Sequence, residues 1–182
     1  MDSPTRVVFL IGFMASGKPT LTNAIMKLAE NVETFDLDDV VERAAGCSIK
    51  EIFATRGEDA FRELESSVLH RLAGEAGSVP RIIACGGGTP CHRGNMEFMN
   101  STGQTVRLSV TPERIFSRLM QFRSERPLVA SLSESELMEK ITTMLADREP
   151  YYSRCRHSFG ANRLESEAQV RNAALRIIRR FL

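Results

Sequence analysis

The sequence predicts an α/β fold, a parallel β-sheet flanked by helices, and two observations carry that prediction. Short apolar runs alternate with segments of helical periodicity along the whole chain. A glycine-bounded turn that ends in lysine stands between the first apolar run and the first helical segment. With 182 residues, 42% of them hydrophobic and 26% charged, the chain has the size and composition of a single globular domain spanning 1–182.

Strands and helices are expected in strict alternation through most of the chain. Short runs bounded by turn residues predict strands at 7–11, 33–38, 81–85, 104–110 and 156–161, the last at a sheet edge. Apolar residues three and four positions apart predict helices at about 21–29, 39–45, 49–57, 61–72, 92–99, from 112, 134–148 and 170–181. Glycines end several of these helices, and Pro112 opens one at its first position.

The turn Gly12–Lys18 has the spacing G-x-x-x-x-G-K, which between a strand and a helix predicts a phosphate-binding loop. Its glycines let backbone N–H groups converge on an anion, while the helix N-terminus and the lysine add positive charge. A plain glycine turn is the alternative. The strand before the turn and the helix after it favour the phosphate site.

Pro19 stands where a phosphate loop has a Ser or Thr whose hydroxyl ligates Mg²⁺. Proline has neither a hydroxyl nor an N–H, so one metal ligand and one phosphate donor are missing. The first turn of a helix tolerates proline, yet Pro19 should hold Lys18 out of the α conformation. Thr20 is a geometrically poorer substitute. The sequence therefore predicts a phosphate loop with a weakened magnesium end.

Two aspartates lie at the end of the strand predicted at 33–38, and three glycines follow the strand predicted at 81–85. Because ligands bind beyond the carboxyl ends of parallel strands, we expect both groups to line one crevice. Asp36 and Asp38 face one side of an extended chain, where they can hold Mg²⁺ or accept a substrate proton. Capping the next helix is their alternative role. The triple glycine, Gly86–Gly88, either lets a ligand approach the backbone or forms a simple tight turn.

Arginines at four positions suit anion binding. Arg62 is spaced to pair with Glu65 on the margin of an apolar helix face, and Arg148 lies in phase with the apolar face of its own helix. The alternative role for both arginines is structural: their methylene groups would cover apolar surface while the guanidinium stays in solvent. Arg123 and Arg126 lie in a polar, irregular segment, 122–135, that is typical of a mobile lid. They either close over transferring phosphate or remain solvated.

Charge and cysteine content bear on the expected partners and cellular location of the protein. The 24 basic and 23 acidic residues leave a net charge of +1, which gives no reason to expect nucleic acid or a membrane surface as a partner. The four cysteines form no C-x-x-C pair, so we expect free thiols and a cytoplasmic location. The start of the chain lacks the charged-then-apolar layout of a signal peptide. We also expect the protein to be a monomer.

Taken in order, these motifs resemble those of the shikimate kinase family over nearly the whole chain. The resemblance rests on the phosphate loop at 12–18, the acidic motif at 35–42, the helices at 48–65, the triple glycine, the lid sequence at 126–128 and the segment 148–152. It implies a P-loop NTPase fold of the nucleoside-monophosphate-kinase type, with the substrate-binding region at about 37–65. It also implies phosphate transfer from ATP, with Mg²⁺, to the 3-hydroxyl of shikimate in aromatic amino-acid biosynthesis.

The resemblance implies roles for individual residues. Substrate binding falls to Asp38, Arg62, Gly86, Gly87, Gly88 and Arg148. Nucleotide binding falls to Gly12, Ala15, Ser16, Gly17, Lys18, Pro19, Thr20, Arg118, Arg126 and Arg163, with Arg118 and Arg163 flanking the adenine. Lys18 and Arg126 stabilise the transferring phosphoryl group, Asp38 serves as base or orients the attacking hydroxyl, and Asp36 supports the metal through water.

This chain departs from the family pattern on the nucleotide side. Pro19 replaces the metal-binding hydroxyl, and Ala15 stands where the family has a third loop glycine. The pair Ala84–Cys85 lacks the hydroxyl found before the triple glycine. A working shikimate kinase is the favoured interpretation. The alternatives are a weak or inactive shikimate-binding relative and a kinase of another small polyol, such as gluconate.

Overall fold

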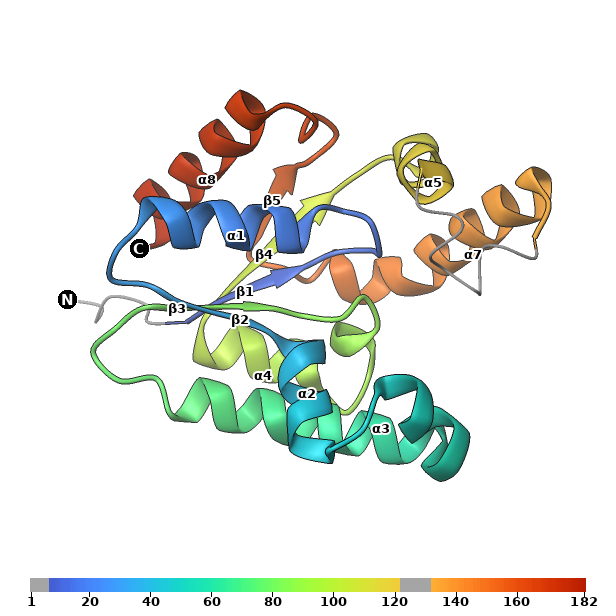
Figure 1. Ribbon diagram of the computed structural model, residues 1–182, viewed down its shortest axis with the longest axis horizontal. Helices are drawn as coiled ribbons and strands as arrows, with labels where there is room; N and C mark the ends of the chain where they lie inside the picture. The colour runs from blue at the N-terminus through green and yellow to red at the C-terminus, as the bar shows by residue number, and fades with distance from the viewer. Residues whose placement is uncertain (1–6, 122–131) are drawn as a thin grey trace.

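A parallel sheet of five strands forms the centre of the molecule in the computed structural model, which describes residues 7–121 and 132–182 (Figure 1). The strands are β1 (Val7–Ile11), β2 (Glu33–Asp36), β3 (Arg81–Ala84), β4 (Gln104–Ser109) and β5 (His157–Gly160). Their order is β2-β3-β1-β4-β5, and every neighbouring pair is parallel. The sheet therefore brings the carboxyl ends of β2, β3 and β1 together at one edge.

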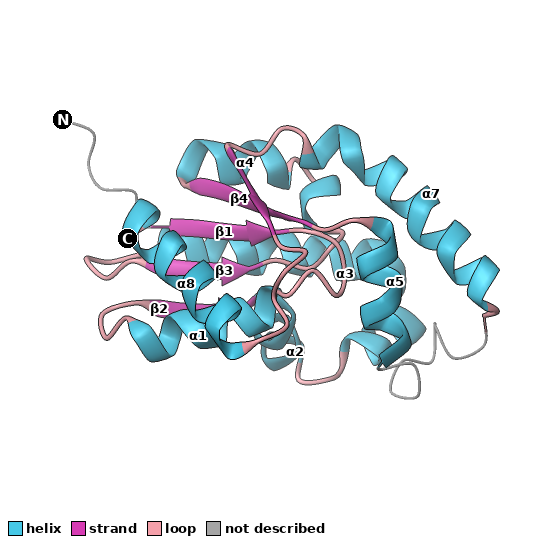
Figure 2. Ribbon diagram, turned by 90° about the horizontal axis from the view of Figure 1, so that it is seen from above, coloured by secondary structure: helices cyan, strands magenta, loops and turns pink. Residues whose placement is uncertain are grey.

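Helices cover both faces of this sheet (Figure 2). On one face lie α1 (Lys18–Leu28) and α8 (Glu167–Phe181), and on the other α2 (Leu37–Ala45), α3 (Ile49–Gly74) and α4 (Asn95–Thr102). Beyond the carboxyl ends of the strands lie α5 (Pro112–Gln121) and the first turns of α7 (Glu134–Tyr152). A short 3₁₀ turn, η1 (Thr89–Cys91), follows the triple glycine. The predicted α/β class is confirmed.

The two faces of the central strand supply two separate cores. Val7, Phe9 and Ile11 pack among residues of α2, α3 and α4, whereas Val8 and Leu10 pack against α1 and α8. All five residues of β1 are buried because successive side chains of a strand point to opposite faces, both of which are covered here. This explains why the strand is an unbroken apolar run rather than an alternating one.

Several boundaries differ from the predicted ones. Gly57 has φ +81° and breaks α3 where the sequence predicted a stop, so that prediction is confirmed. The helix predicted from His92 begins only at Asn95, because Arg93 (φ +53°) and Gly94 (φ +67°) form a left-handed turn before it. The helix predicted to end at Arg148 continues to Tyr152. No helix in the described part of the chain combines the length and apolar character that a bilayer span requires.

Candidate active site

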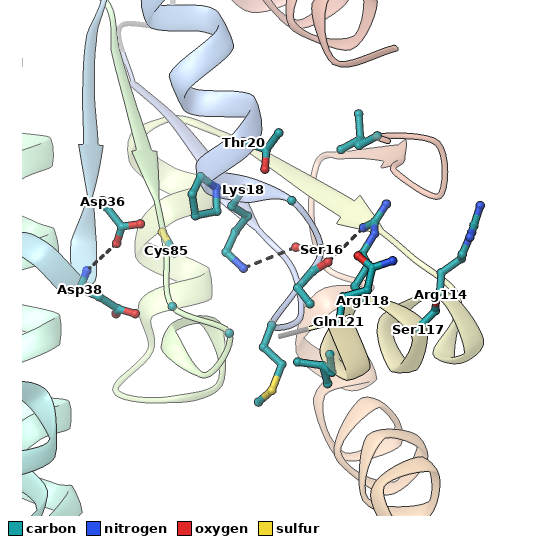
Figure 3. A pocket seen from close by; sticks show the side chains of 18 of the residues that line it. Ser16, Lys18, Thr20, Asp36, Asp38, Cys85, Arg114, Ser117, Arg118 and Gln121 are labelled. Carbon is teal, nitrogen blue, oxygen red and sulfur yellow. Dashed lines mark hydrogen bonds between the residues drawn. The ribbon is translucent and has the colours of Figure 1, made fainter. Parts of the chain in front are cut away.

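The carboxyl ends of the central strands open into a cleft of about 850 Å³ (Figure 3). Residues 14–20 of the glycine turn lie at its centre, with Lys18 pointing into it. Asp36 and Asp38 line one side, and residues of α5 line the other. Parts of the chain that are far apart in sequence therefore converge on one turn, as expected for ligand binding in a parallel sheet.

The glycine turn needs its two glycines for different close contacts. Gly12 has φ +148°, and a Cβ there would lie 2.8 Å from the carbonyl oxygen of Leu108. Gly17 has φ +97°, and its Cβ would lie 2.9 Å from the side chain of Leu164. Ala15 also has a positive φ, +59°, which costs an alanine about 1–2 kcal/mol compared with a helical conformation. The loop thus keeps its shape without the third glycine, at some cost in stability.

Lys18 is folded back onto the turn that precedes it. Its Nζ donates to the carbonyl oxygen of Gly12 at 2.8 Å and to that of Phe13 at 3.1 Å, and its side chain is almost fully buried. Burial lowers the pKa of Lys18 to about 8, although the neighbouring carboxylates of Asp36 and Asp38 act in the opposite direction. The ammonium group is therefore mainly charged at pH 7 and stands inside a ring of backbone groups, where an anion can meet it.

Pro19 does not disturb the entry into α1. The helix begins at Lys18, with Gly17 as its N-cap and the N–H of Leu21 donating to the Gly17 carbonyl at 3.0 Å. The prediction that Pro19 would hold Lys18 out of the helix is wrong, because the clash with proline disfavours the α conformation of the preceding residue without forbidding it, and Lys18 is the first residue of α1. The proline therefore changes the chemistry of the turn and leaves its shape intact.

Asp36 and Asp38 both line the cleft, but the backbone that carries them is not the extended strand that the sequence predicted. The strand ends at Asp36, which caps α2 by accepting the N–H of Asp38 at 3.0 Å, so the predicted extended conformation through Asp38 is wrong. Local capping outcompeted strand extension here. Burial, with the neighbouring Asp36 and Glu65, raises the pKa of Asp38 to about 6, and burial also raises the pKa of Asp36. A Cβ on Gly86 would lie 3.1 Å from Oδ1 of Asp38, so the glycine makes room for this carboxylate.

The donors around the cleft suit Mg²⁺ only as a hydrated ion. No group of three or more His, Cys, Asp or Glu residues able to hold a metal occurs in residues 7–121 and 132–182. Asp36 and Asp38 both line the cleft near Lys18, and Pro19 offers no oxygen on its side chain. Mg²⁺ commonly keeps several waters and binds through one or two carboxylates and phosphate oxygens. The two aspartates fit that pattern, with no direct hydroxyl ligand at position 19.

Arg62 is held by acidic side chains at the edge of the triple glycine. Its Nη1 donates to Glu65 at 2.9 Å, which is the pairing that the sequence predicted, and Glu58 lies 3.3 Å away on the other side. Glu65 is 1% exposed, and its second oxygen accepts the hydroxyl of Thr89 at 2.6 Å. A Cβ on Gly88 would lie 2.7 Å from Nη2 of Arg62. The guanidinium group of Arg62 is thus held between two carboxylates and lies against the backbone of Gly88.

Arg148 is held by an aromatic ring in place of an acid. Its guanidinium lies 5.1 Å from the ring centroid of Phe13, and a Cβ on Gly87 would lie 2.8 Å from its Nη1. Among the residues the structure describes, no carboxylate forms an ion pair with it. A cation stacked on an aromatic face keeps its charge available to an incoming anion. Arg62 and Arg148 therefore meet neighbouring members of the same glycine run.

The far wall of the cleft comes from α5 and from the loop after β5. Arg118 donates to the carbonyl of Ala15 at 3.0 Å and to that of Ala161 at 2.8 Å, which ties the two loops together. Arg163, predicted beside it, is exposed and does not line the cleft, where Leu164 and Glu165 stand instead.

Five residues of α5 line the cleft, and one of them, Arg118, was predicted from the sequence. They are Leu119 and the polar residues Arg114, Ser117, Arg118 and Gln121. The spacing of the four polar residues, i, i+3, i+4 and i+7, marks one helical face and is a signal that could have revealed them. The lid arginines, Arg123 and Arg126, lie outside the described residues.

The chain is similar to known proteins of one named family. A family model described as shikimate kinase matches residues 14–179. A curated protein named shikimate kinase from Phocaeicola vulgatus is 42% identical over 163 residues, covering 90% of this chain and 91% of that protein. Another from Bacteroides thetaiotaomicron is 40% identical over 170 residues, covering 93% and 95%.

Solved structures agree with the sequence relatives. The crystal structure of a shikimate kinase from Bacteroides thetaiotaomicron has a TM-score of 0.87 and 38% identity, covering 95% of this chain and 96% of that one. A shikimate kinase from Acinetobacter baumannii in complex with shikimate has a TM-score of 0.79 and 27% identity, covering 96% and 92%. A gluconokinase from Sinorhizobium meliloti shares the fold, with a TM-score of 0.57 and 16% identity, covering 98% and 94%.

Proposed function

The chain belongs to the shikimate kinase family, and we propose that it transfers the γ-phosphoryl group of ATP to the 3-hydroxyl of shikimate. The observation that carries the proposal is the position of the triple glycine between two sets of groups. Gly86 and Gly87 line the cleft that holds Lys18, while Gly87 and Gly88 touch Arg148 and Arg62. A phosphate site and a carboxylate site therefore share one stretch of backbone.

On the nucleotide side, the turn Gly12–Lys18 holds the phosphates through its N–H groups and the N-terminus of α1. Lys18 exchanges its bonds to the turn's carbonyls for bonds to the β- and γ-phosphates as the nucleotide enters. Arg118 presents its guanidinium beside the adenine, held by the carbonyl oxygens of Ala15, Ala161 and Asn162. Arg126, which lies outside the described residues, would add positive charge near the transferring phosphate, and the exposed Arg163 would add positive charge near the adenine.

On the substrate side, Arg148 and Arg62 hold the carboxylate, and the glycine N–H groups hold ring oxygens. Arg148, with which no carboxylate of the described chain forms an ion pair, carries the larger share of the charge interaction. Asp38 accepts the proton of the attacking 3-hydroxyl or orients it. With a pKa of about 6, Asp38 is mainly ionised at pH 7 and is a better base than an ordinary aspartate.

Mg²⁺, when bound, neutralises charge on the β- and γ-phosphate oxygens of ATP. In this chain Asp36, next to Asp38, would hold the ion through water. The hydroxyl that would ligate the ion directly is absent at Pro19. The phosphate oxygens of the nucleotide would therefore supply most of the ion's direct ligands.

Pro19 favours a second candidate, a shikimate-binding relative with weak or no turnover. The arginines and glycines on the substrate side are intact, while the departures fall on the nucleotide side, and Pro19 is the one that removes a metal ligand. A gluconate kinase receives no comparable support, because the likeness to gluconokinase shows the fold alone.

We also propose that the enzyme is a monomeric, single-domain protein of the cytoplasm. The four cysteines are all free, which suits a reducing compartment.

A coupled assay for shikimate-dependent ADP release, with Mg²⁺ and with EDTA, tests the proposal. We expect ADP release that requires both shikimate and Mg²⁺, with gluconate inactive as acceptor. If shikimate binds but ADP release stays at the rate without acceptor, the non-catalytic alternative is correct. Release with gluconate but not shikimate would refute the substrate assignment.

A further inference from the structure

Tyr152, the last residue of α7, is buried against the triple glycine and has no part in the chemistry described above. Its side chain is 1% exposed, and its hydroxyl donates to the carbonyl oxygen of Gly87 at 2.6 Å. The carbonyls of Gly86 and Gly88 accept instead from backbone N–H groups three residues further on. Burial raises the pKa of Tyr152 to about 12, so the phenol stays protonated and remains a donor across the physiological range.

Holding the Gly87 carbonyl also fixes a donor on the opposite side of the same peptide. The bond between Gly87 and Gly88 is trans and planar, so the N–H of Gly88 points away from the carbonyl that Tyr152 holds. Gly88 is buried, and its N–H donates to no acceptor among the described residues. A buried N–H without an acceptor costs free energy, so a ligand that supplies an oxygen there binds more tightly.

The ring of Tyr152 is itself clamped from a second direction. Arg107 lies over it, 5.3 Å from the ring centroid, and its Nη1 and Nη2 each donate to a carboxylate oxygen of Glu149 at 2.7 Å. Arg148, one turn earlier on α7, meets Gly87 through its Nη1. The last turn of α7 therefore positions both the carboxylate-binding arginine and the glycine peptide beside it.

We infer that Tyr152 is a positioning residue whose hydroxyl locks the Gly87–Gly88 peptide, so that the Gly88 N–H and Arg148 together receive the oxygens of a bound hydroxy acid. This inference rests on the proposed function for the identity of that acid. Tyr152 acts through its bond to Gly87, and its hydroxyl also interacts with Arg148, which lowers the pKa of the phenol against the larger effect of burial. The neighbouring Tyr151 is about one-third exposed and offers a matched control.

Calorimetric titrations of Tyr152→Phe and Tyr151→Phe with shikimate and with ADP test the inference. We expect Tyr152→Phe to raise the Kd for shikimate about tenfold, or about 1.4 kcal/mol, and to leave the Kd for ADP within about twofold. Tyr151→Phe should change neither. A shikimate Kd unchanged in Tyr152→Phe would overturn the inference, and so would an equal loss of ADP affinity, which indicates general disorder.

A ligand-free measurement separates this inference from the proposed function. If the unsubstituted protein binds ADP but no shikimate, the proposed function fails, and amide hydrogen exchange still tests the role of Tyr152. We expect exchange at Gly88 to be about tenfold faster in Tyr152→Phe than in Tyr151→Phe, because the lost hydroxyl releases the peptide. Exchange at Gly17 should not change. Equal rates at Gly88 in the two variants would overturn the inference.

The chain has two tyrosines, so a third measurement covers the case in which Tyr152→Phe does not fold. Labelling the unsubstituted protein with 3-fluorotyrosine gives two ¹⁹F signals, which Tyr151→Phe assigns. Shikimate should move the Tyr152 signal and leave the Tyr151 signal in place. A Tyr152 signal that shikimate does not move, in protein that binds shikimate, would overturn the inference.

Discussion

Replacing Pro19 by serine should raise kcat, because it restores the hydroxyl that can ligate Mg²⁺ directly. Pro19 lies in the first turn of α1 and lines the cleft beside Lys18. The backbone there is already helical, so serine needs no rearrangement to place its hydroxyl. The change also restores a backbone N–H at a helix N-terminus, which is a favourable place for a donor to phosphate.

The size of the gain follows from what one interaction with developing charge is worth. Removal of a single donor aimed at transition-state charge commonly costs about 10²–10³ in rate. The hydroxyl acts through the metal and only one of its ligands changes, so the gain should fall below that range. We expect kcat to rise by well over tenfold, which is more than about 1.4 kcal/mol of activation free energy. The Mg²⁺ concentration for half-maximal rate should fall as well.

Pro19→Ala is the matched control, because it restores the N–H without the hydroxyl. The coupled assay at several Mg²⁺ concentrations should place Pro19→Ala near the unsubstituted chain and Pro19→Ser well above both. If serine brings no gain, the metal-ligand argument is refuted. An equal gain from alanine would assign the defect to the missing N–H.

Three further predictions follow from the pKa shifts and the glycine contacts. The kcat/KM for shikimate should rise with pH through about 6 as Asp38 loses its proton and fall above about 8 as Lys18 loses its own, which a pH–rate profile measures. Ala15→Gly should raise Tm by about 2–4 °C in calorimetry, because it removes about 1 kcal/mol of left-handed strain. Gly88→Ala should weaken shikimate binding at least about tenfold without affecting ADP, because its methyl group displaces Arg62 while its own φ of −92° suits any residue.

Each of these predictions has a contrasting variant or outcome. A flat profile between pH 5 and 9 would contradict the assigned roles of the aspartate and the lysine. Ala24→Gly, in the middle of α1, should lower Tm, and a similar fall in Ala15→Gly would show that position 15 is unstrained. Gly74→Ala meets no atom within 4 Å and should leave shikimate binding unchanged.

The apolar pattern predicted most of the fold because burial alone decides it. The unbroken apolar run Val7–Ile11 indicated a strand covered on both faces, and all five residues are buried. Helical periodicity on both sides of Gly57 indicated two helical segments with a break at the glycine, and α3 has that break. The pattern failed where two local structures compete at a boundary. At Asp36, the side chain captures the N–H of Asp38 and starts a helix, and no hydrophobic period reports that choice.

Contacts in the candidate site could be predicted where the two residues lie a helical turn apart in the sequence. Arg62 and Glu65 are three apart on one helix, so their pairing could be expected, and the structure contains it. The contacts of Arg148 and Tyr152 with Gly87 join residues more than sixty positions apart in the chain. Such contacts depend on how α7 docks against the triple glycine, which no local pattern encodes.

The most direct test of the account is a calorimetric titration of shikimate into the protein saturated with ADP. One shikimate should bind per chain, at least about tenfold more weakly in Gly88→Ala and with unchanged affinity in Pro19→Ser. Absence of binding for both ADP and shikimate to folded protein would contradict the claim that a phosphate-binding turn and a carboxylate-binding pair of arginines share the triple glycine.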